Sequence, residues 1–359
     1  MRTLSTLTTA FAVAAITAIS APATGGGFVD VMASPAQSSP LASRSLLQAV
    51  TRAGDRLIAV GQRGHIVVSR DAGTTWQQAK VPVSSDLVAV YFVDAARGWA
   101  VGHDGVVLNT LDGGETWQLQ LDGRKANDLV VAAMERKVAA EPASEDARKL
   151  LAEAKRYREQ GPDKPFLDVW FADADHGFVV GAYNLIFRTT DGGKTWESWF
   201  DRTDNPKFFN LYAIRPAAGT LFIAGEAGLV LTLDPAKQRF GAVRVSYNGS
   251  FFGVTAARNA VLIFGLRGNV FRSDDGGGSW TKVETGLPAS VVATTRTSRG
   301  ATLLGDIGGR VIATDDGGRT FRPVALKQSV PLTGMAEAGE GRLALTGPRG
   351  VSVTEAAAP

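Results

Sequence analysis

The chain has 359 residues, of which 45% are hydrophobic and 20% are charged, a composition that excludes a disordered protein. A formal net charge of only +3 gives no overall field of the kind that nucleic-acid binding requires, so we expect no nucleic-acid partner. The absence of cysteine excludes disulfides and thiolate metal sites. The three histidines, His65, His103 and His176, lack the spacing of metal ligands, so no metal and no cofactor is expected.

The N-terminus predicts a secretory signal peptide over residues 1–23. Arg2 supplies the positive charge, Ala10 to Ile19 is a short apolar stretch, and Ala21-Pro22-Ala23 fits the small-x-small cleavage rule. The alternative is a disordered or buried N-terminal segment. No lipobox cysteine follows, and no later segment is apolar and long enough to cross a bilayer. We therefore expect export to a bacterial periplasm, either free or peripheral to a membrane.

A repeat dominates the rest of the chain. Val90 to Gly102 (VYFVDAARGWAVG) and Val169 to Gly181 (VWFADADHGFVVG) are nearly superimposable. The closing glycine recurs, mostly at intervals of 40 to 44 residues, at Gly61, Gly102, Gly181, Gly225, Gly265, Gly305 and Gly347. Units of about 40 residues with strand patterns are typical of propeller blades with four strands. The fold class predicted for residues 46–359 is all-β, a seven-bladed β-propeller.

A second motif follows five of these glycines and resembles the Asp-box of BNR-type propellers. Its aspartates and aromatics are Asp71 with Trp76, Asp112 with Trp117, Asp191 with Trp196, Asp275 with Trp280, and Asp316 with Phe321. We expect each aspartate to hydrogen-bond amides of its own turn and each aromatic ring to pack between blades. These residues are therefore predicted to be structural rather than catalytic.

The fourth and seventh units depart from the pattern. The fourth has Leu233 to Phe240 in place of the box, and the seventh ends one strand short, at Val351 to Thr354. An open strand edge there would promote aggregation. Residues 24–45 are predicted to be a linker that also supplies the closing strand, from either Gly27 to Met32 or Leu41 to Leu46.

An insertion of about 40 residues, residues 124–164, separates the second and third units. Asn127-Asp128 is predicted to cap a first helix that runs through Val138. Ser144 is predicted to cap a second helix that runs to Glu159, with Glu145/Lys149 and Lys155/Glu159 as ion pairs. Gly161-Pro162 then ends the helix. The insertion should be a helical hairpin over the face described next, either as a solvated decoration or as a lid or docking element.

Turns between the second and third strands share a face with the crossovers between blades. On this face we expect an arc of basic side chains over blades five, six, seven and one. The residues predicted to bind a partner are Arg63, Arg267, Arg310 and Arg349, with Arg202, Lys207 and Tyr183 nearby. Arginine binds carboxylates in a bidentate, oriented way, so an acidic or C-terminal segment of a protein is the expected partner. The alternative is that these arginines are ordinary exposed surface.

The signal peptide, the Gly-x-x-Gly turns, the repeated Asp-Gly-Gly-x-Thr-Trp boxes and the lack of cysteine together resemble the photosystem II stability/assembly factors and their bacterial relatives. The resemblance covers about residues 41–355. It implies a non-catalytic assembly scaffold that handles a reaction-centre protein through a basic face, with Arg63, Arg267, Arg310 and Arg349 in matching positions. The helical insertion departs from the family pattern, so the client is either photosynthetic or another envelope or membrane complex.

Asp-boxes also occur in sialidases, so a sialidase-like glycoside hydrolase or a carbohydrate-binding propeller is the alternative. Tyr183 and Glu226 could resemble a nucleophile pair, and the arginine arc could resemble an arginine triad. The Arg-Ile-Pro signature is missing, however, since Ile214-Arg215-Pro216 only scrambles it. We therefore predict a protein that is not an enzyme.

Overall fold

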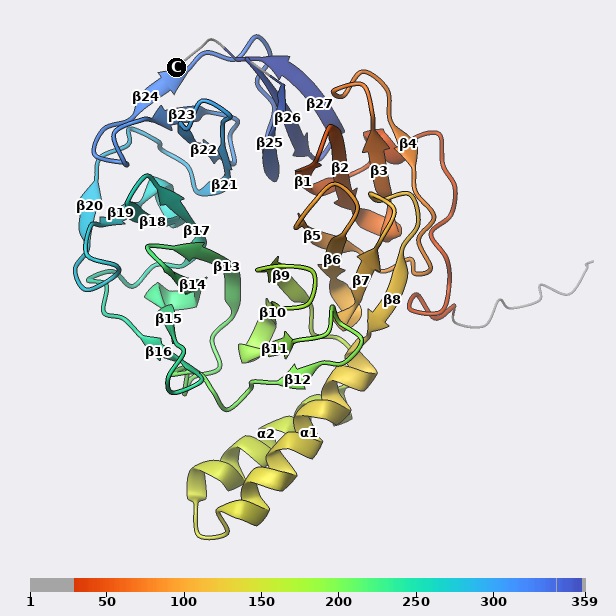
Figure 1. Cartoon of the computed structure of the whole chain (residues 1–359), viewed down its shortest axis with the longest axis vertical. Coiled ribbons are helices and arrows are strands. Elements are labelled where there is room, and N and C mark those ends of the chain that lie inside the picture. The colour runs from red at the N-terminus through yellow and green to blue at the C-terminus, as the bar shows by residue number, and fades with distance from the viewer. Residues whose placement is uncertain (1–28, 340, 357–359) are drawn as a thin grey trace, which may run out of the picture.

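The structure is a computed structural model that describes residues 29–339 and 341–356. These residues form seven antiparallel sheets around a central axis, and the molecule is a β-propeller (Figure 1). Six sheets have four strands in sequence order and one has three. The all-β class predicted from the repeats is confirmed. The predicted signal peptide, residues 1–23, lies outside the described residues.

The sheets are numbered one to seven along the chain. Sheet one contains β1 (Leu47–Ala53), β2 (Arg56–Gly61), β3 (Ile66–Ser69) and β4 (Gln77–Gln78). Sheet two contains β5 (Leu87–Phe92), β6 (Gly98–Gly102), β7 (Val107–Thr110) and β8 (Gln118–Leu121). Sheet three contains β9 (Phe166–Phe171), β10 (Gly177–Gly181), β11 (Ile186–Thr189) and β12 (Glu197–Ser198). Sheet four contains β13 (Leu211–Ala217), β14 (Thr220–Gly225), β15 (Val230–Asp234) and β16 (Arg239–Ala242).

The remaining sheets complete the circle. Sheet five contains β17 (Phe251–Ala257), β18 (Ala260–Gly265), β19 (Val270–Ser273) and β20 (Thr281–Val283). Sheet six contains β21 (Val291–Arg296), β22 (Thr302–Asp306), β23 (Val311–Thr314) and β24 (Arg322–Val324). Sheet seven contains β25 (Gly334–Gly339), β26 (Arg342–Gly347) and β27 (Gly350–Glu355).

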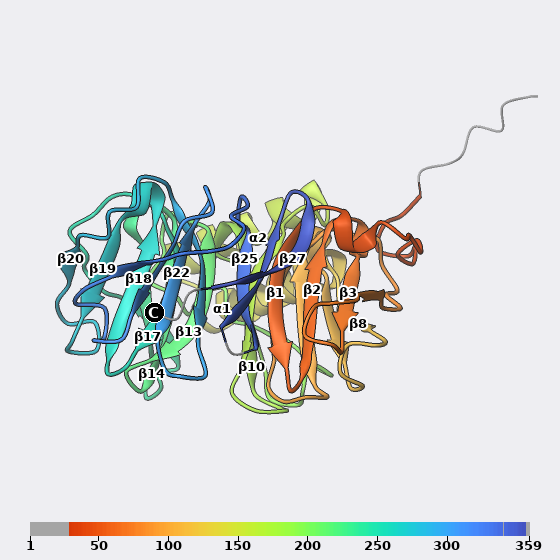
Figure 2. The ribbon, with the colours of Figure 1, turned by 90° about the horizontal axis from the view of Figure 1, so that it is seen from above.

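The two ends of the chain meet between sheets one and seven. The first strand of each sheet contacts the first strand of the next, and β25 contacts β1. The hydroxyl of Thr333 donates to the backbone oxygen of Leu47 at 2.7 Å. In side view the sheets stand next to one another, with strands running between two faces of a disc (Figure 2).

The second strand of each sheet is buried on both sides, because every sheet is packed between two neighbours. All five residues of β6 (GWAVG) and of β10 (GFVVG) are buried. This explains why the repeats show continuous apolar runs rather than alternation. Burying one such valine or leucine side chain contributes roughly 1.5–3 kcal/mol.

The recurring glycine is required by a close backbone contact. A Cβ on Gly102 would lie 2.0 Å from the backbone oxygen of Asp86, just before β5. A Cβ on Gly61 would lie 2.2 Å from the equivalent oxygen of Leu46. Any larger residue would push the second strand away from the segment that leads into the first.

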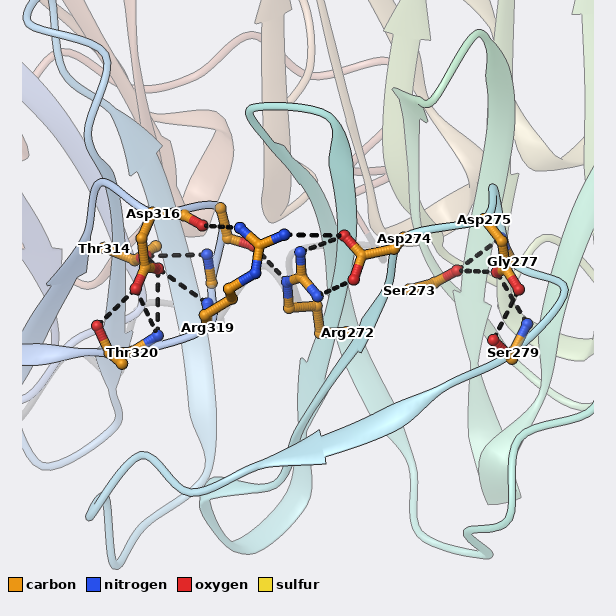
Figure 3. Close-up of polar contacts among 12 residues, drawn as sticks. Arg272, Ser273, Asp274, Asp275, Gly277, Ser279, Thr314, Asp316, Arg319 and Thr320 are labelled. Carbon is orange, nitrogen blue, oxygen red and sulfur yellow. Dashed lines mark hydrogen bonds and ion pairs between the residues drawn. The ribbon is translucent and has the colours of Figure 1, made fainter.

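The Asp-boxes form one repeated hydrogen-bond pattern. In sheet one, Asp71 accepts from the N–H and the hydroxyl of Thr75 at 2.9 and 2.6 Å, and from the hydroxyl of Ser69 at 2.8 Å. The boxes of sheets five and six repeat these contacts (Figure 3). Gly73 takes a φ of +88° that favours glycine. The turn is therefore held by its own side chains, as predicted.

The box aromatics pack against the preceding sheet. Trp117 lies in one apolar cluster with Ile58 and Val68 of sheet one, and Trp196 lies in another with Trp99 of sheet two. Side chains also tie neighbouring boxes together: the guanidinium of Arg272 donates to the backbone oxygen of Gly317 at 2.7 Å. The predicted packing of these rings between sheets is confirmed.

The predicted closing strand is wrong for the described part of the chain. Leu41 to Leu46 contains a short 3₁₀ turn, Ala42–Arg44, that leads into β1, and residues 29–32 form no strand. The chain instead runs outside sheets one and two, where Met32 is buried and the N–H of Ala36 donates to Val81 O at 3.0 Å. Apolar anchoring of this segment and the β1–β25 contact replace the expected strand pairing.

The insertion is a helical hairpin of α1 (Gly123–Ala140) and α2 (Glu145–Gln160). It projects outward from the edge of the ring, so it does not cover the centre as a lid (Figure 1). It is anchored to the ring near its base, where the hydroxyl of Tyr157 donates to Tyr183 O at 3.2 Å, and again near its tip, where Lys137 pairs with Asp201 at 3.2 Å. No helix in the described residues is long and apolar enough to span a membrane.

The cap predicted for the first helix is wrong, and the second is confirmed. Asp122 caps α1 by accepting from Lys125 N–H at 2.9 Å. Asn127 is instead buried inside α1 and donates to Gly161 O at 3.0 Å, which ties α1 to the end of α2. Ser144 caps α2 through Ala147 N–H at 3.1 Å.

The predicted ion pairs of the second helix do not form. Lys149 lies 3.8 Å from Asp146, and Lys155 lies 3.8 Å from Glu135 of the other helix. Lys149 is therefore near a carboxylate three residues earlier in its own helix, and Lys155 is near a carboxylate on the other helix of the hairpin.

We predict that Met32→Ala lowers the free energy of unfolding by about 2 kcal/mol, because it removes a buried side chain that anchors the N-terminal segment. Urea denaturation measures this. Leu41→Ala, in the same segment but 59% exposed, is the control and should change stability little. Equal effects of the two substitutions would contradict the anchoring role of Met32.

Candidate functional site

The face of the disc that carries the turns between second and third strands is called the turn face. Because the strands of each sheet follow one another as an antiparallel meander, these turns and the Asp-boxes lie at opposite ends of the strands. Five of the turns are short 3₁₀ turns of three residues each: Gln62–Gly64, His103–Gly105, Ala182–Asn184, Glu226–Gly228 and Leu266–Gly268. Asp306 to Arg310 and Gly347 to Gly350 are the corresponding turns of sheets six and seven.

The middle residue of each 3₁₀ turn has a left-handed backbone conformation. Arg63, Tyr183 and Arg267 have φ values of 57°, 54° and 58°. The N–H of Arg63 donates to Asp86 at 2.7 Å and that of Tyr183 to Asn210 at 2.9 Å, both residues that precede the next sheet. The backbone is thus fixed to the neighbouring sheet while the side chain is exposed.

The structure brings four of the predicted arginines to the turn face. Arg63, Arg267, Arg310 and Arg349 are all exposed, and they belong to sheets one, five, six and seven. These sheets are neighbours in the ring because β25 contacts β1. Within the described part of the chain, none of the four guanidinium groups has an ion-pair partner. Their donors are therefore available to a ligand.

The other predicted residues are more engaged with the protein. Arg202 pairs with Glu197 at 2.7 Å and lies 4.9 Å above the ring of Trp199. Lys207 is exposed, with its ammonium 5.6 Å from the ring of Phe209. Tyr183 is 50% exposed on the turn of sheet three. Arg202, Lys207 and Tyr183 therefore lie on a different part of the ring from the arginines of sheets five, six, seven and one.

Two basic residues of the turn face escaped the sequence analysis. Arg44 precedes β1 beside the turn of sheet one, where Ser45 contacts His65 at 3.1 Å. Arg244 lies in the crossover between sheets four and five. Both are exposed. A scan of every crossover, in addition to the turns, would have found them.

The inner strands enclose a central channel with a volume of about 430 Å³. Asp168 and Arg215 lie on its wall, with an ion pair of 2.6 Å, and Asp168 also accepts from Ile214 N–H at 2.8 Å. The guanidinium of Arg215 stacks 5.6 Å from the ring of Tyr91. These contacts link sheets two, three and four and leave the pair internally satisfied.

The residues that suggested a hydrolase are held in structural contacts. The Glu226 carboxylate accepts from the backbone N–H of Asn210 at 3.1 Å. The side chain of Asn210 in turn accepts from the backbone N–H of Tyr183 at 2.9 Å. The Glu226 carboxylate thus fixes the crossover between sheets three and four. In the described residues, no group of three His, Cys, Asp or Glu side chains could hold a metal ion.

The sequence pattern of the family described as "Photosynthesis system II assembly factor YCF48" matches residues 30–109, 68–137 and 156–304. The chain belongs to this family. The matched segments leave out residues 138–155, which form the tip of the helical hairpin between α1 and α2. Of the predicted insertion, residues 124–164, the family pattern therefore covers the two ends and leaves out the middle.

Individual relatives match over shorter segments. Photosystem II assembly lipoprotein Ycf48 of Synechococcus sp. (strain CC9902) is 29% identical over 137 residues, 37% of this chain and 41% of that protein. Photosystem II stability/assembly factor HCF136 of Cyanidioschyzon merolae is 38% identical over 71 residues, 18% of this chain and 16% of that protein. The chain thus aligns with less than half the length of these relatives.

Two solved structures share the fold over most of the chain. "YCF48 bound to D1 peptide" superimposes with a TM-score of 0.63 at 14% identity, over 89% of this chain and 95% of that one. YCF48 from Cyanidioschyzon merolae gives a TM-score of 0.59 at 16% identity, over 90% and 99%. A streptogramin B lyase also superimposes, with a TM-score of 0.65 at 10% identity over 92% of this chain and all of that one, so likeness of fold alone does not define activity.

We predict that the Asp-boxes make stability depend on acid pH. Hydrogen bonds from the hydroxyl and then the N–H of Thr75 lower the pKa of Asp71 to about 2. Because the folded-state pKa lies below the unfolded value of about 3.9, the contribution of Asp71 is complete above pH 4 and is lost as the pH falls towards 2. The stability difference between wild type and Asp71→Asn in urea should therefore shrink over that range.

The control for this titration is Asp55→Asn, because Asp55 is fully exposed and lies 3.8 Å from Arg52. Its effect should be small at every pH. A difference for Asp71→Asn that stays constant between pH 5 and pH 2 would show that the box does not bind its aspartate in the charged form.

Proposed function

We propose that this protein is an exported, non-catalytic binding and assembly factor that docks a protein partner on its turn face. The observation that carries the proposal is the row of four exposed arginines without ion-pair partners, among the described residues, on four consecutive sheets. Guanidinium groups favour carboxylates because two parallel N–H donors match the two carboxylate oxygens. Arg244 extends the same positive surface beyond sheet five, and Arg44 adds a positive charge between sheets seven and one.

We propose that the ring is a closed, seven-bladed propeller in which each sheet is one blade. The three-stranded seventh sheet then serves as a blade whose outer strand is absent from the described chain. Contact between β1 and β25 supports this arrangement, since it makes sheets seven and one neighbours. The basic surface is continuous only if that closure holds.

The chemistry of the surface indicates an acidic or carboxylate-terminated segment of a protein under assembly. A relative of the same fold has been solved bound to a D1 peptide, which supports a peptide segment as the ligand. The family's named members act in photosystem II assembly, so a reaction-centre protein is the first candidate client. The tip of the helical hairpin, residues 138–155, offers an additional surface that the family pattern does not cover.

We propose a periplasmic location, on the membrane side where such a client would present its exported segments. The N-terminal sequence supports export, because a charged residue, an apolar stretch and a small-x-small site follow in order. Named relatives are lipoproteins, which also supports a place near a membrane.

We predict that Arg63→Ala, Arg267→Ala and Arg349→Ala, combined in one variant, weaken binding of a synthetic D1 peptide at least tenfold, or about 1.4 kcal/mol. The reason is the loss of three exposed guanidinium groups without change to the turn backbones. Fluorescence anisotropy measures the affinity, and circular dichroism confirms folding.

The matched control removes three arginines from the opposite face: Arg97, Arg258 and Arg319. Peptide affinity should stay within twofold of wild type in this variant, apart from a small effect of net charge. Equal losses in both variants would refute a specific turn-face site, and unchanged affinity in the first variant would refute the proposed function.

A further inference from the structure

In the part of the chain that the structure describes, sheet seven ends at β27, which has no fourth strand beside it (Figure 1). In the other six sheets a fourth strand pairs with the third, and in sheets one and three that fourth strand is only two residues long, Gln77–Gln78 and Glu197–Ser198. A very short segment is therefore enough to complete a sheet of this propeller. In the described residues, β27 pairs along its length with β26. Its C-terminal end is also engaged, because Leu326 forms a single bridge with Ala356 and Gln328 N–H donates to the hydroxyl of Thr354 at 3.0 Å.

Hydrogen bonding identifies which backbone groups of β27 face outward. Ala356 N–H donates to Gly341 O, on the side of β26, and Glu355 O accepts from Lys327 N–H on the outer side. Since the direction alternates along an antiparallel strand, Val351 and Val353 also direct their N–H and C=O groups outward. Neither has a strand partner on that side within the described chain. The outward N–H and C=O groups of these two residues are therefore unpaired among the described residues.

Two hollows follow β27 along this edge. One, of about 600 Å³, is lined by Val353, Glu355, Arg342, Lys327 and the Asp-box turn of sheet one. The other, of about 400 Å³, is lined by Gly347 to Gly350, Ser352 and the crossover Gln328 to Pro331. An extended segment placed beside Val353 would therefore enter the first hollow, and its continuation past Gly350 and Ser352 would approach the second.

The charged side chains around the two hollows indicate which kind of segment would bind beside β27. Lys327 and Arg342 flank the first hollow and Arg349 lines the second, against the single carboxylate of Glu355. Arg342 is exposed and has no ion pair among the described residues, while Lys327 lies 3.5 Å from Glu355. Val351 and Val353 are half-buried and offer apolar contacts to alternate side chains. The surface fits an extended segment that alternates apolar and acidic residues.

The described N-terminal segment does not lead to this edge. Asp30 pairs with Arg124 at the base of α1 at 2.8 Å, on the far side of sheets one and two from sheet seven. Residues Ala42–Arg44 contact β27 through apolar packing of Ala42 and through Ser43 O, which approaches Gly350, and they form no strand beside it. A partner chain is therefore the better source of the added strand.

We propose that the outer edge of β27 binds an extended acidic segment of a partner protein by strand addition, as a second docking surface that shares only Arg349 with the turn-face arginines. Backbone hydrogen bonds to Val351 and Val353 supply affinity, and Arg342 and Lys327 select acidic side chains. Exposed edges of this kind otherwise promote self-association, so a specific occupant also protects the protein.

The probe is a fluorescein-labelled, end-capped peptide of eight residues that alternates valine and glutamate. Hydrogen exchange should slow at the amides of Val351 and Val353 on peptide addition. Val351→Pro, which removes one outward N–H, should weaken binding at least tenfold, while Val351→Thr should bind as wild type. Arg342→Glu tests the charge without altering the strand and should weaken binding at least fivefold. A valine–lysine peptide should bind at least tenfold more weakly.

A variant that combines Arg63→Ala and Arg267→Ala separates this proposal from the turn-face function. The valine–glutamate peptide should still slow hydrogen exchange at the amides of Val351 and Val353 in this variant, whatever the variant's effect on binding of the D1 peptide. Three results would overturn strand addition by a partner. They are no slowing of exchange at millimolar peptide, slow exchange in the free protein that deletion of residues 1–28 abolishes, and a dimer in light scattering that Val351→Pro dissociates.

Discussion

The contact between β1 and sheet seven determines how the basic turns of the first and last sheets lie relative to one another. It joins residues 286 positions apart, through the hydroxyl of Thr333 and the backbone oxygen of Leu47. Gly334 allows the close approach, since a Cβ there would lie 3.0 Å from Ala49 Cα. If the ring did not close at this point, Arg349 and Arg63 would lie at opposite ends of an open array and could not share a ligand.

Within residues 29–339 and 341–356, sheets one and seven meet without a shared strand, and this has a consequence for stability. A propeller that closes through side-chain packing between neighbouring sheets relies on apolar contacts such as those of Ala42, Val353 and Ala344 rather than on a ladder of backbone hydrogen bonds. The same choice leaves the edge of β27 exposed. The open edge is therefore the structural cost of this closure, and the N-terminal segment strengthens sheets one and two instead.

Features fixed by local geometry could be predicted from the sequence. Gly102 recurs because a backbone oxygen approaches it, and Asp71 recurs because its carboxylate satisfies the donors of its own turn. Long-range choices could not be predicted. Nothing local indicates that Met32 is buried against sheets one and two, or that Asn127 serves α2 rather than the start of α1.

The candidate site shows the same division. The glycines of the repeat align the turns, and this alignment alone puts Arg63 and Arg267 at equivalent positions, which the structure matches. Arg44 and Arg244 lie outside the repeated motif, so only the path of the chain brings them to the turn face. No local pattern indicates that Arg202 is held by Glu197 and Trp199.

The left-handed turns explain how a surface of flexible side chains can bind with definite geometry. A residue other than glycine at positive φ is strained, and it persists only where the surroundings hold it. At Arg63 and Arg267 the backbone N–H is bonded to Asp86 and to Ser290, so each Cα is fixed relative to the next sheet. Binding then has to order only the side-chain torsions, which lowers the entropy cost of docking. The same bonds link the turns to the packing of neighbouring sheets, so in the docking mode proposed here a ligand spanning several turns would also stabilise the contacts between sheets.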